Sequence, residues 1–137
     1  MSEIQSLLLL KKVSKEFGIG TIDRVKALDN INLSINEHDS ITVIGSNGAG
    51  KTTLLNIIAG VYPPERGGNI IINNMDITNL VEHKRSQYFG RVYQDPHIGT
   101  AAKMTIGENL SLAIARGRSR GLRVATTKKR LTYFQEI

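Results

Sequence analysis

The sequence contains no cysteine, and no uninterrupted apolar run is longer than the four leucines at positions 7–10. Without a thiol the chain forms neither a disulfide nor a thiolate metal site, which suits a reducing cytosol. A run of four apolar residues falls far short of the roughly 20 that a membrane span requires. The first residues also lack the positive charge of a signal peptide. We therefore expect any membrane role to come through a partner.

Acidic residues are missing from one stretch of the chain. Residues 116–130 contain seven lysines and arginines and no acidic residue. The rest of the chain has 11 basic and 12 acidic residues, a charge of −1, so the net charge of +6 comes from this stretch. Such a stretch is compatible with a solvated helical face, a docking surface for a partner subunit or anionic lipid headgroups, or a nucleic-acid patch. It contains no aromatic residue that could stack on a base, which weakens the last interpretation.

Residues 45–52 match the phosphate-loop pattern G-x-x-x-x-G-K-[ST] completely. Glycines suit such a loop because wrapping a polyphosphate requires left-handed backbone and a close approach to the ligand. The backbone N–H groups and the positive end of the following helix would then bind the phosphates. We expect Lys51 to reach the β- and γ-phosphates and the Thr52 hydroxyl to coordinate Mg²⁺.

The segments on either side of this loop predict the strand and the helix that the motif requires. Residues 41–44 are mostly β-branched and favour a buried strand, whereas residues 53–59 favour a helix that ends at Gly60. The alternative is a glycine turn that joins a strand to a helix and binds nothing. The match of motif and context favours a nucleotide site.

Further strands are predicted from alternation and β-branched content at residues 7–13, 28–36, 69–72, 75–77 and 90–93. The pair Asn73-Asn74 tolerates positive φ and therefore predicts a tight turn between two of them. A short polar helix is expected within residues 80–87.

A capping box is predicted at Thr105 and Glu108, where each side chain can bond the other residue's backbone N–H. In the helix that follows, Ile106, Leu110 and Ile114 recur at four-residue spacing and form an apolar stripe. We expect this stripe to be ordinary core packing.

Together these segments resemble the ATP-binding subunit of ATP-binding-cassette (ABC) transporters. The resemblance rests on residues 46–55 at the phosphate loop, on residues 75–78, on Val-Tyr-Gln-Asp-Pro at 92–96, and on residues 104–110. It implies an α/β protein with a P-loop NTPase fold of ABC type. One departure is His38, which stands where the family usually has glycine.

The resemblance implies a role for each matching residue. Phe17 would stack on adenine, although it could equally be a core aromatic, and Gln94 would approach Mg²⁺ and the γ-phosphate. The expected Mg²⁺ ligands are Thr52 and Gln94. The full set expected to bind ATP is Phe17, Gly45, Ser46, Asn47, Gly48, Ala49, Gly50, Lys51, Thr52, Thr53 and Gln94.

The resemblance also implies how the chain is organised. Residues 1–137 would form part of an ABC-type nucleotide-binding domain, with an antiparallel N-terminal sheet and phosphate-loop core at 1–95 and the start of a helical subdomain at 96–137. The family's signature segment, its Asp-Glu strand and its switch histidine do not occur before Ile137. We therefore expect the isolated chain to bind ATP weakly at best and not to hydrolyse it.

The function implied is that of an ATP-binding subunit that couples ATP hydrolysis to transport. Its partners would be a transmembrane permease subunit and a second ATP-binding subunit, and it would lie in the cytoplasm on the inner face of the membrane. No nucleic acid is expected to bind. The alternatives are a non-transport ABC ATPase acting on nucleic acid or ribosomes, for which the basic stretch would be the contact surface, and an inactive truncated remnant.

Overall fold

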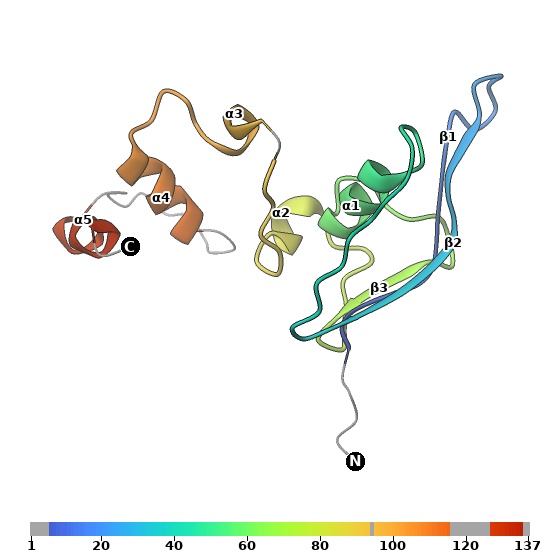
Figure 1. The fold of residues 1–137 in the computed structure, drawn as a ribbon, viewed down its shortest axis with the longest axis horizontal. Coiled ribbons are helices and arrows are strands. Elements are labelled where there is room, and N and C mark those ends of the chain that lie inside the picture. The colour runs from blue at the N-terminus through green and yellow to red at the C-terminus, as the bar shows by residue number, and fades with distance from the viewer. Residues whose placement is uncertain (1–5, 94, 116–126, 136–137) are drawn as a thin grey trace, which may run out of the picture. The chain divides into compact units, whose positions relative to one another are not determined.

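A computed structural model describes residues 6–93, 95–115 and 127–135. The chain divides into two units, Met1–Tyr88 and Phe89–Ile137, and each is described by itself (Figure 1). The first unit contains the sheet and the predicted phosphate loop. The domain division expected after residue 95 stays a prediction.

An antiparallel four-stranded sheet forms the first unit, with the strand order β2-β1-β3-β4. The strands are β1 (Ser6–Phe17), β2 (Val25–Asn36), β3 (Asn69–Ile72) and β4 (Met75–Asp76). Both long strands extend beyond the predicted ranges. The expected antiparallel N-terminal sheet is thus confirmed.

A bulge interrupts β1 within its predicted range. Leu10 faces Leu33 and Val13 faces Ile31, so β1 carries one more residue than β2 between these two pairs. Lys12, within this interval, has a φ of 49°. Since side chains alternate along a strand, the extra residue keeps Val13 on the same buried face as Leu10.

The turn between β3 and β4 has the predicted form. Asn73 and Asn74 have φ values of 46° and 62°, the left-handed backbone that a two-residue hairpin turn requires. The backbone N–H of Asn73 also donates to the carbonyl of Leu7, which anchors the hairpin to β1. The asparagine pair therefore ends β3 at the expected place.

The core of the first unit lies between the sheet and α1 (Lys51–Ala59), which follows the phosphate loop. The helix ends as predicted, because Gly60 has a φ of 87° and its N–H bonds back to the last turn. The buried apolar side chains are Leu8, Leu10, Val13, Leu28, Leu54, Ile57, Ile70, Ile72 and Ile77. These side chains come from β1, β2, β3 and α1, together with Ile77, which follows β4.

Arg85 is fully buried at the far end of α1, on the one-turn helix α2 (Glu82–Arg85). Its guanidinium donates to the carbonyls of Ile57 and Ile58, in the last turn of α1, at 2.7 and 3.0 Å. It also donates to the carbonyls of Thr78 and Leu80, each at 2.7 Å. Burial lowers the pKa of Arg85, while the charge of Asp76 acts in the opposite direction. This arginine was not singled out from the sequence.

Two predicted strands are wrong. Residues 41–44 and 90–93 have no strand structure, and Ile41, Val43 and Ile44 are exposed rather than buried. A buried strand requires a hydrogen-bonded neighbour along its edges, and none of the described strands pairs with either segment. The β-branched composition was therefore not enough to make a strand.

The second unit contains α3 (Pro96–Gly99), α4 (Ile106–Ile114) and α5 (Lys128–Gln135). The capping box at Thr105 and Glu108 is present with both reciprocal bonds, as predicted. The predicted core stripe is wrong, because Ile106, Leu110 and Ile114 are all exposed.

The remaining expectations concern the basic stretch and the membrane. Residues 116–126 lie outside the described residues, so the interpretations of the basic stretch stay predictions. Within the part of the chain that the structure describes, every helix is too short or too polar to cross a membrane.

Candidate functional site

The predicted phosphate loop adopts the backbone that its glycines were expected to provide. Gly48 and Gly50 have φ values of 84° and 86°. The N–H of Ala49 donates to the carbonyl of Ser46 at 3.2 Å, and that of Leu54 donates to the carbonyl of Gly50 at 2.9 Å. The first bond forms a turn within the loop, and the second begins the hydrogen bonding of α1.

Gly50 also packs closely against the neighbouring sheet. A Cβ atom at this position would lie only 2.4 Å from the carbonyl oxygen of Ala27, in β2. No other residue fits there without displacing the strand, and the left-handed φ adds a further penalty for any side chain. The start of α1 is therefore held directly against β2.

The N-terminus of α1 has no side-chain cap. Its N-cap is Gly50, and its first turn contains no acidic residue. The first N–H groups of a helix lack intrahelical partners and carry a partial positive charge. This end of the helix is thus suited to bind an anion, and the curled loop in front of it adds further N–H groups.

Lys51 folds back over the loop. Its Nζ donates to the carbonyls of Gly45 and Ser46, each at 2.7 Å. Two hydrogen bonds to backbone carbonyl oxygens therefore hold the ammonium group at the first residues of the loop. A phosphate oxygen is a stronger, charged acceptor that could replace them.

The two threonines after Lys51 differ in exposure. Thr52 is exposed and Thr53 is half-buried, while Asn47 lies in the exposed loop. Mg²⁺ in nucleotide sites is typically held by one or two protein oxygens together with phosphate oxygens and water. The exposed hydroxyl of Thr52 fits this chemistry. Gln94, the other expected ligand, lies outside the described residues.

Phe17 is the last residue of β1 and is half-buried. Its ring packs edge-to-face against Tyr62, with the ring centroids 5.4 Å apart and an interplanar angle of 78°. The Nζ of Lys15 lies over the Phe17 ring, 5.6 Å from its centroid. Half burial leaves part of the ring accessible to a base, so both interpretations of Phe17 are compatible with its surroundings. Tyr62 was not singled out from the sequence.

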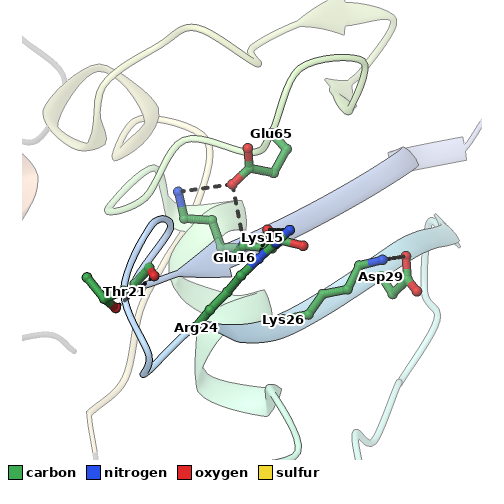
Figure 2. A network of polar contacts seen from close by, with 8 residues as sticks. Lys15, Glu16, Thr21, Arg24, Lys26, Asp29 and Glu65 are labelled. Atoms are coloured by element: carbon green, nitrogen blue, oxygen red, sulfur yellow. Dashed lines mark hydrogen bonds and ion pairs between the residues drawn. The ribbon is translucent and has the colours of Figure 1, made fainter.

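A polar network joins β1 to the loop that follows α1 (Figure 2). The carboxylate of Glu65 accepts from the N–H of Glu16 at 3.3 Å and pairs with Lys15 Nζ at 3.9 Å. The N–H of Glu65 donates to the carbonyl of Ser14 at 3.0 Å. Arg24 in turn pairs with the Glu16 carboxylate at 2.7 Å. Glu16 and Glu65 are 49 positions apart, so no local sequence pattern could indicate this contact.

Comparison with protein families agrees with this geometry. The family model described as "ABC transporter" matches residues 28–136. A tyrosine transport ATP-binding protein of Clostridioides difficile (strain R20291) is 43% identical over 112 residues, which cover 82% of this chain and 44% of that protein. A lipoprotein-releasing system ATP-binding protein LolD of Rickettsia bellii (strain RML369-C) is 42% identical over 92 residues, covering 67% of this chain and 40% of that protein.

Solved structures are similar as well. The dimeric structure of MJ0796, a bacterial ABC transporter cassette, superposes with a TM-score of 0.72 at 28% identity and covers 94% of this chain and 54% of that one. The ADP conformation of MJ1267, an ATP-binding cassette of an ABC transporter, superposes with a TM-score of 0.65 at 32% identity. This match covers 93% of this chain and 45% of that one. The chain therefore has the predicted fold, and it spans about half the length of these cassettes.

Proposed function

This chain belongs to the ABC transporter family, and on that premise we propose that it is the ATP-binding portion of a subunit that couples ATP hydrolysis to transport across a membrane. The observation that carries the proposal is the loop at 45–50, which is followed by an uncapped helix start. This arrangement supports polyphosphate binding because each part of it offers positive charge or an N–H donor to the same place.

The proposed binding mode divides the phosphate contacts between backbone and side chain. Within residues 46–52, the N–H groups other than that of Ala49, which is bonded to Ser46, would bind the phosphate chain. Lys51 would exchange its two carbonyl contacts for phosphate oxygens. Thr52 would hold the Mg²⁺ that bridges the phosphates, and Gln94 would complete the ion's protein ligands. Mg²⁺, when bound, supplies neutralisation of the phosphate charge. Thr53, which is half-buried, would also bind the nucleotide.

The partners and the place of action are part of the same proposal. The relatives are named as transport or release-system ATP-binding proteins, and this chain spans 44% of the tyrosine transport protein. We infer a transmembrane permease subunit and a second ATP-binding subunit as partners, and a cytoplasmic location on the inner face of the membrane. Hydrolysis is proposed only for the intact cassette.

A substitution of Lys51 tests the proposal. A hydrogen bond to a charged group contributes roughly 1.5–3 kcal/mol, so Lys51→Ala should weaken ATP binding about 10- to 150-fold. The measurement is a titration of the chain with a ribose-labelled fluorescent ATP analogue in the presence of Mg²⁺.

Lys84→Ala is the matched control, because Lys84 is an exposed lysine on α2, away from the loop. It should bind ATP like the unsubstituted chain. If Lys51→Ala and Lys84→Ala bind with the same affinity, the proposed site is wrong.

A further inference from the structure

Tyr62 makes a directed contact with the residue proposed to stack on adenine. The rings of Tyr62 and Phe17 meet edge-to-face at a centroid distance of 5.4 Å. Such a geometry is favoured by the quadrupoles of the two rings and restricts how either ring can turn. Both rings are half-buried, so the pair is neither a closed core nor a freely exposed surface.

The position of Tyr62 is set by the helix that carries the phosphate loop. The N–H groups of Val61 and Tyr62 donate to the carbonyl of Asn56, in α1, at 2.9 and 3.5 Å. Tyr62 follows Gly60, at which the helix ends. One rigid helix therefore carries the phosphate loop at its start and places Tyr62 just after its end.

The other side of the same loop is held by β1. The Glu65 carboxylate accepts from the N–H of Glu16 and pairs with Lys15 (Figure 2). The N–H of Glu65 donates to the carbonyl of Ser14, and the Lys15 ammonium lies over the Phe17 ring. Residues 61–65 thus bridge the end of α1 to the strand that carries Phe17. This bridge gives Tyr62 a defined position relative to Phe17.

We propose that Tyr62 is a positioning residue for the base end of the nucleotide site, holding the Phe17 ring in the orientation in which it stacks on adenine. The inference rests on the proposed function, ATP binding at the loop, and adds to it the stacking of Phe17 on adenine that the family resemblance implies. Tyr62 acts through Phe17 and does not itself touch the ligand. It should therefore affect the recognition of adenine and leave the recognition of phosphate unchanged.

The test compares two ligands. A ribose-labelled ATP analogue is displaced from the 137-residue chain by unlabelled ATP or by inorganic triphosphate, both with Mg²⁺, and the ratio of their affinities measures base recognition. Phe17→Ala should lower this ratio about 5- to 150-fold, as expected for the loss of one base stack. Tyr62→Ala should lower it about 2- to 12-fold, the range for one aromatic pair.

Further variants separate positioning from folding. Tyr62→Phe keeps the ring and should retain the original ratio, whereas Tyr62→Leu keeps apolar volume without a ring and should behave like Tyr62→Ala. The double variant of Phe17→Ala with Tyr62→Ala should lose no more than Phe17→Ala alone, because coupled residues are not additive. Tyr133→Ala, an exposed tyrosine of α5 in the other unit, is the control and should change nothing.

Each result decides the matter in one direction. An equal loss of ATP and triphosphate affinity in Tyr62→Ala, or additive losses in the double variant, overturns the positioning role. An unchanged affinity ratio in Phe17→Ala also overturns the positioning role. If ATP binding still depends on Lys51 in that case, the proposed function stands and only this inference fails. If ATP binding does not depend on Lys51 at all, the proposed function fails and this inference fails with it.

Discussion

The two ends of α1 are built in opposite ways. At its start, the N-cap is a glycine without a side-chain acceptor, and the charged group nearby, Lys51, is bonded only to exposed loop carbonyls. At its end, the carbonyls of Ile57 and Ile58 are bonded by the buried guanidinium of Arg85, and Gly60 returns its N–H to the helix. The first end leaves its polar groups for a ligand, whereas the second satisfies them within the protein.

This difference separates binding from stability along one helix. Unbonded donors at an exposed helix start cost little because water can solvate them, and they remain ready for phosphate. Unbonded carbonyls at a buried helix end are expensive, because no water replaces the missing donor. Changes at the start of α1 should therefore alter ligand affinity, and changes at its end should alter the free energy of unfolding.

The largest expected effect is at the closed end. Arg85→Ala would remove the guanidinium donor from four buried or part-buried carbonyls, those of residues 57, 58, 78 and 80, although the Ile57 carbonyl would keep the N–H of Gly60. The substitution should lower the free energy of unfolding by about 3–5 kcal/mol. Urea unfolding followed by far-UV circular dichroism measures this loss. The control is Arg66→Ala in the exposed loop, which should stay within about 0.5 kcal/mol. Equal urea midpoints for Arg85→Ala and Arg66→Ala would contradict the stabilising role assigned to the end of α1.

A smaller effect is expected at the glycine that ends the helix. Gly60→Ala would force a side chain into left-handed backbone at φ 87° and would place its Cβ 2.9 Å from Cδ of Arg85. The backbone term alone is roughly 1–2 kcal/mol, and the contact adds to it. Gly67→Ala is the matched control, since Gly67 has a similar φ of 91° and open space around its Cα. Thermal or urea unfolding should show a lower free energy of unfolding for Gly60→Ala than for Gly67→Ala. The same loss in both variants would mean that the Arg85 side chain moves aside without cost to accommodate the added Cβ.

The smallest effect concerns a helix start that is closed, that of α4. Thr105 accepts from the N–H of Glu108 and the Glu108 carboxylate accepts from the N–H of Thr105, so this end is closed where that of α1 is open. Thr105→Ala should weaken the helix by about 1 kcal/mol. Amide hydrogen exchange across residues 106–114 measures this change, and Thr42→Ala in the other unit should leave that exchange unaltered.

The same capping box gives α4 a pH dependence. The hydrogen bonds from the backbone and side chain of Thr105 lower the pKa of Glu108 below its usual value. A carboxylate with a lowered pKa in the folded state stabilises above its unfolded pKa, and that contribution is lost as the pH falls through the folded value. Protection of residues 106–114 should thus fall in acid below about pH 4.3, and Glu108→Gln should remove this part of the pH dependence.

Features encoded within a few neighbouring residues were predictable from the sequence. The phosphate loop, the helix end at Gly60, the asparagine turn and the capping box depend on residues close together in the chain, because φ preferences and local hydrogen bonds act over one turn. The roles assigned to Gln94 and to the basic stretch remain predictions, since these residues are outside or largely outside the described part of the chain.

The tertiary structure decided what depends on distant parts of the chain meeting. Arg85 bonds carbonyls that lie 27 and 28 positions earlier, and Tyr62 reaches a ring on β1, so neither contact leaves a local pattern. The segment at 41–44 and the stripe on α4 have the composition of buried structure, yet both are exposed. The amino-acid composition of a segment indicates that its surface is apolar. Whether that surface is buried depends on another element of the fold packing against it.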